Sequence, residues 1–163
     1  MTTTDTHSPA SIERTDDGVT LRFDRSYDRP RDAVWRALTD PSELEHWLDR
    51  SSVDLRVGGA FTVLFDDGTM NGRITDLDPE RLLAYKWHEG QFGESHVRWD
   101  LEDRPGGGTN LTLTHVRLRA ESASGFAAGW HHHLERMDGL LSNGPTAWNS
   151  DRFEELHEMY QRS

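Results

Sequence analysis

The stretch that decides the fold is SGFAAGWHHHLERMDGLLSN, residues 124–143. Its bulky apolar residues recur at steps of three and four, which places them on one stripe of an α-helix. The stripe consists of Phe126, Trp130, Leu134, Met137 and Leu141. A helix with one apolar face needs an apolar surface to lie on. The strands predicted elsewhere in the chain could supply that surface, so we expect helix and sheet to enclose a pocket.

The rest of the chain has the patterns of short helices and strands. Residues 19–24 alternate apolar and polar side chains, which predicts a strand. Two short helices follow, divided by an Asp-Pro pair at residues 40–41, because the residue before proline disfavours the helical conformation. Residues 52–118 form short alternating segments between turn signals such as Asp-Asp-Gly at 66–68, which predicts antiparallel hairpins. With a terminal helix over residues 148–160, the order predicts an α+β fold: a curved antiparallel sheet of about seven strands around a long C-terminal helix, with two short helices after the first strand.

Length and composition limit the classes of protein to consider. The chain has 163 residues, which fits a single domain; we assign it to residues 18–163, preceded by a flexible N-terminal tail over residues 1–17. There is no cysteine, which excludes disulfides and thiol nucleophiles. The formal net charge of −11 argues against nucleic acid and membrane surfaces as partners. No signal sequence or apolar run of membrane length is present, so a cytoplasmic location is the expectation.

The histidine triplet at residues 131–133 invites a metal site, but helical geometry argues against one. Neighbouring residues on a helix point about 100° apart, so three consecutive histidines cannot share one ion. Measured from Trp130, His132 lies on the far side and His131 on the flank, and only His133 lies near the inward stripe. We therefore predict no metal site, and no motif indicates a cofactor.

His115 is the second histidine of interest. It follows Leu111 and Leu113 in phase, so it points to the apolar side of its strand. One interpretation is a core histidine bonded to a carbonyl or hydroxyl group. The other is a polar handle for a ligand or a proton carrier, because imidazole titrates near neutral pH. His115 and His133 could face each other across the pocket, and they are the candidate catalytic residues.

Many large side chains are predicted to point inward, and they are the candidate ligand-binding residues. Such residues line apolar pockets, but they also fill cores, and sequence does not separate the two. The candidates are Trp47, Phe61, Phe65, Met70, Tyr85, Trp87, Trp99, His115, Trp130, His133 and Met137. No nucleophile motif of the GxSxG type and no phosphate-binding glycine loop is present.

Several motifs in this order resemble the START-like (SRPBCC) superfamily, and within it the branch of homologues of the activator of heat-shock protein 90 ATPase. The matching residues are Pro30, Asp32, Val34-Trp35, Ala37 to Pro41 and Trp47, then Gly58 to Phe61, Asp78 to Leu82, Gly108-Thr109, Leu111 to His115, and Gly129-Trp130 with Leu134. The resemblance covers roughly residues 18–160. It implies the helix-grip fold, in which a curved antiparallel sheet holds a C-terminal helix over an apolar cavity.

Three functional hypotheses follow. The first is binding of a small, largely hydrophobic molecule in the cavity, as superfamily members do. The second is an enzyme of cyclase or hydrolase type that uses His115 or His133 as a general base. The third is a chaperone-linked interaction module. The eukaryotic-type co-chaperone carries an additional N-terminal domain, whereas only about seventeen residues precede the domain here, so the third hypothesis ranks last.

Overall fold

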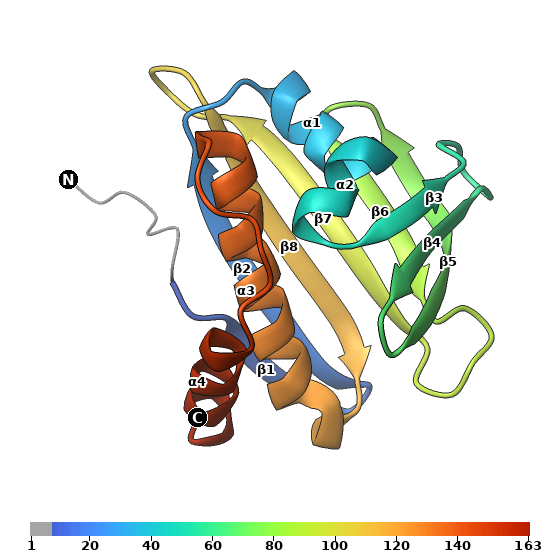
Figure 1. The fold of residues 1–163 in the computed structure, drawn as a ribbon. Coiled ribbons are helices and arrows are strands. Elements are labelled where there is room, and N and C mark those ends of the chain that lie inside the picture. Colours follow the sequence, from blue (N-terminus) through green and yellow to red (C-terminus); the bar gives the residue numbers. More distant parts are fainter. Residues whose placement is uncertain (1–7) are drawn as a thin grey trace.

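The computed structural model describes residues 8–163 and shows one curved sheet with a long helix across it (Figure 1). The sheet is antiparallel, with the strand order β1-β2-β8-β7-β6-β5-β4-β3. The strands are β1 (Ser11–Thr15), β2 (Gly18–Tyr27), β3 (Arg50–Val53), β4 (Ala60–Phe65), β5 (Gly68–Asp78), β6 (Leu82–Trp87), β7 (Ser95–Asp103) and β8 (Thr109–Leu118). The helices are α1 (Arg31–Thr39), α2 (Pro41–Trp47), a 3-10 turn η1 (Ala120–Ser122), α3 (Ala123–Ser142) and α4 (Ser150–Gln161). The predicted α+β fold is confirmed.

The sheet has eight strands because part of the predicted flexible tail is a strand. β1 pairs with β2 from Ser11 opposite Arg22 to Thr15 opposite Gly18, so the tail prediction is wrong for these residues. The segment is polar because β1 is an edge strand with mostly exposed side chains. β1 is held in the sheet by backbone hydrogen bonds to β2 and by Ile12, which packs against the core. Residues 1–7 of the predicted tail lie outside the described residues.

Helices α1 and α2 are separated at Asp40, as predicted from the Asp-Pro pair. The backbone of Asp40 is extended, and its carboxylate accepts a hydrogen bond from the backbone N–H of Ser42 at 3.0 Å. Pro41 then occupies the first helical position, where its missing N–H costs nothing. The indole N–H of Trp47 donates to the carbonyl of Ala37, which ties the two helices together at 2.7 Å.

The core lies between the sheet and α3. Trp130 of α3 packs edge to face against Trp99 of β7, and Trp99 packs in the same way against Trp47 of α2. The ring centroids are 5.6 and 5.9 Å apart, a favourable geometry for aromatic pairs. α3 ends at Ser142, and the left-handed backbone of Asn143 (φ 60°) turns the chain back toward α4. Figure 1 shows α4 packed beside α3 on the side away from β3–β5.

Candidate functional site

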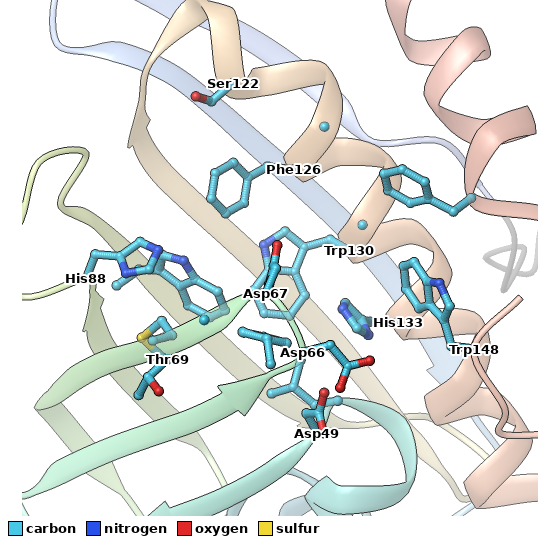
Figure 2. A pocket seen from close by; sticks show the side chains of 18 of the residues that line it. Asp49, Asp66, Asp67, Thr69, His88, Ser122, Phe126, Trp130, His133 and Trp148 are labelled. Atoms are coloured by element: carbon cyan, nitrogen blue, oxygen red, sulfur yellow. The ribbon is translucent and has the colours of Figure 1, made fainter. Parts of the chain in front are cut away.

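One large pocket of about 960 Å³ opens between α3 and the turn that joins β4 to β5, and we call it the main pocket. In Figure 2 the side chains of Phe126, Trp130 and His133 extend from α3 into the same space as those of the β4–β5 turn. The wall consists of Leu48 and Asp49 before β3, Phe65 to Met70 of the β4–β5 hairpin, Trp87 and His88 at the end of β6, Ser122, Gly125, Phe126, Gly129, Trp130, His133 and Arg136 along α3, and Trp148 and Phe153 beyond it.

The main pocket contains some of the residues predicted from sequence and not others. Five of the eleven candidates line it: Phe65, Met70, Trp87, Trp130 and His133. The other six fill the core: Trp47, Phe61, Tyr85, Trp99, His115 and Met137. Phe61 and Tyr85, for example, stack on each other with centroids 4.2 Å apart, which leaves no room between them. Ligand contact by the five lining residues stays a prediction.

His115 is a fully buried member of a hydrogen-bonded chain. The indole N–H of Trp130, which can only donate, reaches Nδ1 of His115 at 2.9 Å. Nδ1 is therefore the acceptor, and Nε2 carries the proton and donates to the hydroxyl of Ser95 at 2.7 Å. Burial, with smaller contributions from His96 and His88, lowers the pKa of His115 to about 3, so the ring is neutral. Both ring nitrogens are satisfied, as the core interpretation of this histidine required.

His133 differs from His115 because it lines the main pocket. Its Nδ1 lies 3.1 Å from the backbone carbonyl of Trp47. Nη1 of Arg136, which can only donate, lies 3.2 Å from the same nitrogen. Burial and the nearby charge of Arg136 lower the pKa of His133 to about 3, so the ring is neutral. The rings of His133 and His115 both contact Trp130, but only His133 is on the pocket wall. The structure therefore does not bring the two candidate general bases to one ligand.

His131 and His132 do not line the main pocket but are buried in the packing around α4. Nδ1 of His131 lies 2.8 Å from the hydroxyl of Tyr160. His132 accepts from the backbone N–H of Asn149 at Nε2 and donates from Nδ1 to Glu135. Among residues 8–163, no group of three or more His, Cys, Asp or Glu side chains could hold a metal ion.

Glu135 is the charged link between α3 and α4. Its carboxylate accepts from Arg152 of α4, with the closest contact at 2.7 Å, and from His132. Burial alone would raise the pKa of Glu135, but these hydrogen bonds and the charge of Arg152 lower it to about 2. The carboxylate is thus ionised and fixes the position of α4 against α3 at neutral pH.

Sequence reasoning missed several residues of the main pocket. Gly125 and Gly129 are one helical turn apart on the pocket side of α3, and their spacing in phase with the apolar stripe was the available signal. Trp148 was assigned to the last helix, but it precedes α4 and lies at the pocket rim. Asp66 and Asp67 were recognised as turn residues, and nothing in the sequence indicates that this turn faces α3.

The family assignment agrees with this architecture. The model for activator of Hsp90 ATPase homolog 1-like proteins matches residues 28–142, well over half of the chain. The chain belongs to this family. The resemblance inferred from sequence motifs is therefore confirmed. A search of curated proteins found no match.

Solved structures include several similar proteins. The crystal structure of CalU16 from Micromonospora echinospora is 26% identical, with a TM-score of 0.76 and 94% of each chain covered. DynU16, from the dynemicin biosynthetic locus, is 26% identical with a TM-score of 0.70, over 82% of this chain and 51% of DynU16. EF2215 from Enterococcus faecalis, a conserved protein of unknown function, shares the fold at 17% identity and a TM-score of 0.77, over 94% of this chain and 88% of that one.

Within the described residues, no helix is both long enough and apolar enough to cross a membrane.

Proposed function

We propose that this protein binds a small, largely hydrophobic molecule in the main pocket. The observation that carries the proposal is the placement of Gly125 and Gly129 in the first two turns of the long helix α3, facing the pocket. Glycine inside a helix costs about 1 kcal/mol relative to alanine. Two glycines at successive turns weaken the helix, so their presence calls for an explanation in what surrounds them.

Packing does not supply that reason. A Cβ atom added at Gly125 or Gly129 would meet nothing within 4 Å. Gly139, on the same helix, is the contrast: a Cβ there would lie 1.8 Å from the carbonyl oxygen of Pro145, so the fold itself requires glycine. At Gly125 and Gly129, glycine keeps open a space that no side chain of the described chain fills, and a ligand is the natural occupant of such a space.

The size and chemistry of the main pocket suit this role. Its volume of about 960 Å³ falls at the upper end of the range of about 300–1,000 Å³ typical of small-molecule sites. The aromatic side chains of Trp87, Trp130 and Phe126 form apolar parts of its wall. The family context supports the same reading, because the SRPBCC-like fold commonly binds hydrophobic ligands, and DynU16 comes from a biosynthetic locus.

The test is ligand binding by the purified protein and by two variants with the same number of changes. Native mass spectrometry should reveal a co-purifying small molecule, or thermal denaturation across a hydrophobic library should find compounds that raise the Tm. The double variant Gly125→Leu/Gly129→Leu should fold but lose that rise, because its side chains enter the pocket. The control Gly125→Ala/Gly129→Ala should keep it and gain about 1–2 kcal/mol of stability.

Two results would contradict the proposal. One is the absence of any bound molecule together with no Tm shift across the library. The other is an unchanged ligand-dependent Tm rise in the double leucine variant, which would place the binding site elsewhere.

A further inference from the structure

The polar groups of the main pocket are predominantly negative. Asp66 and Asp67 on the β4–β5 turn and Asp49 before β3 all line it (Figure 2). Asp66 and Asp67 are exposed, and neither makes an ion pair or side-chain hydrogen bond with any residue in the range 8–163. Two carboxylates at the mouth of the pocket are therefore available to a ligand.

The pocket offers no comparable positive charge. Arg136 is the one lysine or arginine on its wall within the described residues. Its guanidinium donates to three backbone carbonyls: Nε to Thr146 at 2.7 Å, Nη1 to Leu48 at 3.4 Å and Nη2 to His46 at 3.3 Å. Nη1 also lies 3.2 Å from Nδ1 of His133. The guanidinium also lies over the ring of Trp148 at 5.7 Å. Because its donors are engaged in holding loops, Arg136 is poorly placed to receive an anion.

His133 adds a neutral polar edge to the pocket. Its Nδ1 faces the carbonyl of Trp47 at 3.1 Å and Nη1 of Arg136 at 3.2 Å, so Nε2 is the free edge of the ring. Nε2 makes no hydrogen bond with the described part of the chain, and the ring lies between Trp130 and Trp148 at centroid distances of 6.1 and 5.3 Å. A ligand group that meets this edge meets a polar nitrogen without a positive charge.

Aromatic side chains favour the same kind of ligand. Trp87, Trp130 and Trp148 line the pocket, and indole rings attract cations as well as apolar groups. The indole N–H groups of Trp87 and Trp148 have no partner within residues 8–163, so they remain as neutral donors for a hydroxyl or carbonyl group. A neutral ligand is thus acceptable, whereas a carboxylate or phosphate would meet unpaired carboxylates.

We propose that the ligand of the main pocket is an amphiphilic amine, with a ring-containing apolar body between the tryptophans and a protonated amine near Asp66 and Asp67. This inference rests on the proposed function, because it specifies the chemical class of the same ligand. It excludes free fatty acids and phosphate-headed lipids as preferred ligands.

A matched set of probes tests the proposal: 1-pyrenemethylamine, 1-pyrenemethanol and 1-pyrenecarboxylic acid, which share one apolar ring system and differ in charge. Binding is followed by quenching of tryptophan emission. The amine should bind about two- to fivefold more tightly than the alcohol, as expected for exposed ion pairs. The acid should bind more weakly than the alcohol. Added salt should reduce the preference for the amine, because exposed charges are screened.

Charge-removing variants identify the carboxylates involved. Asp66→Asn/Asp67→Asn should bring the affinity for the amine to that for the alcohol and leave the alcohol unchanged. The chain provides a matched control, because the β1–β2 turn has the same Asp-Asp-Gly sequence and does not line the main pocket. Asp16→Asn/Asp17→Asn removes the same charge there and should keep the full preference for the amine.

The outcomes separate this inference from the proposed function. Equal binding of the three probes, tightest binding of the acid, or equal effects of the two asparagine variants would overturn the amine inference while leaving a hydrophobic ligand in place. Binding that survives Gly125→Leu/Gly129→Leu would show that the probes occupy another site and would also overturn it. If none of the probes binds, the amine inference falls, and the hydrophobic library decides the proposed function independently.

Discussion

Replacing His115 with glutamine should destabilise the protein more at pH 7 than at pH 5. In the native state His115 is neutral, with Nδ1 accepting from Trp130 and Nε2 donating to Ser95. Burial, followed by the charges of His96 and His88, lowers its pKa from 6.5 to about 3. The unfolded chain therefore takes up a proton below pH 6.5 that the native protein does not accept until about pH 3. Stability is lost as the pH falls through this window.

The size of the effect follows from proton linkage. Between pH 7 and pH 5, a histidine with a pKa of 6.5 when unfolded and about 3 when folded costs about 1.9 kcal/mol of stability. At pH 7 the variant His115→Gln should lose about 1–3 kcal/mol, because the flexible amide presents its acceptor and donor in a different geometry from the two ring nitrogens. The variant has no group that titrates at this position, so its deficit relative to the wild type should shrink by about 1.9 kcal/mol at pH 5.

Urea denaturation of both proteins at pH 7 and pH 5 measures this change, and carboxylate effects common to the two proteins cancel in the difference. His46→Gln, which replaces an exposed histidine, is the matched control and should follow the wild type at both pH values. Nitrogen-detected NMR of wild-type His115 should show the Nε2-protonated ring at pH 5. A deficit of equal size at the two pH values, or a doubly protonated ring at pH 5, would refute the reasoning.

Further expected outcomes concern α3. Gly139→Ala should lower the Tm by about 3–10 °C, because its Cβ would collide with the backbone of Pro145; an unchanged Tm would contradict this contact. Trp130→Phe should cost about 1–3 kcal/mol in urea denaturation by leaving Nδ1 of His115 without its donor, and full stability would argue against that hydrogen bond. Glu135→Gln should accelerate amide hydrogen exchange in α4 at pH 7, with the difference from wild type shrinking as the pH falls from 4.5 toward 2; equal exchange would exclude the carboxylate as the link between α3 and α4.

The sequence predicted the elements whose stability depends on a repeating apolar pattern. The stripe of α3 and the alternation of β8 set the inward face directly, because side-chain direction follows from helical or strand geometry. Turns with specific chemistry, such as residues 66–68, were also predictable. β1 was missed because an edge strand can be held by backbone hydrogen bonds while most of its side chains remain in water.

The division of inward residues between core and pocket could not be predicted, because it depends on how far the sheet separates from α3. Phe61 and Phe65 have the same phase on β4, yet Phe61 is completely buried and Phe65 lines the pocket four residues further along. The alternating pattern reports the face of the sheet, whereas the distance to α3 comes from sheet curvature. For the same reason, His115 shares the inward phase of its strand but lies in the core.

The histidine triplet shows how one helix meets different surroundings at consecutive residues. Successive side chains rotate by about 100° around the helix. His131 packs edge to face against Phe23 of β2, and His132 bonds to the segment before α4. His133 reaches the carbonyl of Trp47 and the pocket. The triplet therefore joins α3 to three different parts of the fold. Each of the three histidines has a structural role of its own in these contacts.

These contacts also determine which part of the main pocket can admit a ligand. α3 is held by buried hydrogen bonds on its α4 side, and Trp130 is anchored to His115 beneath it. The opposite rim has no such restraints: Asp66 and Asp67 are exposed, and Trp148 retains 42% of its accessible surface. Segments with few buried contacts open at lower free energy than the core. We therefore infer that α3 acts as a fixed wall and that a ligand enters past the β4–β5 turn and Trp148, where the unpaired carboxylates would be the first charged groups it meets.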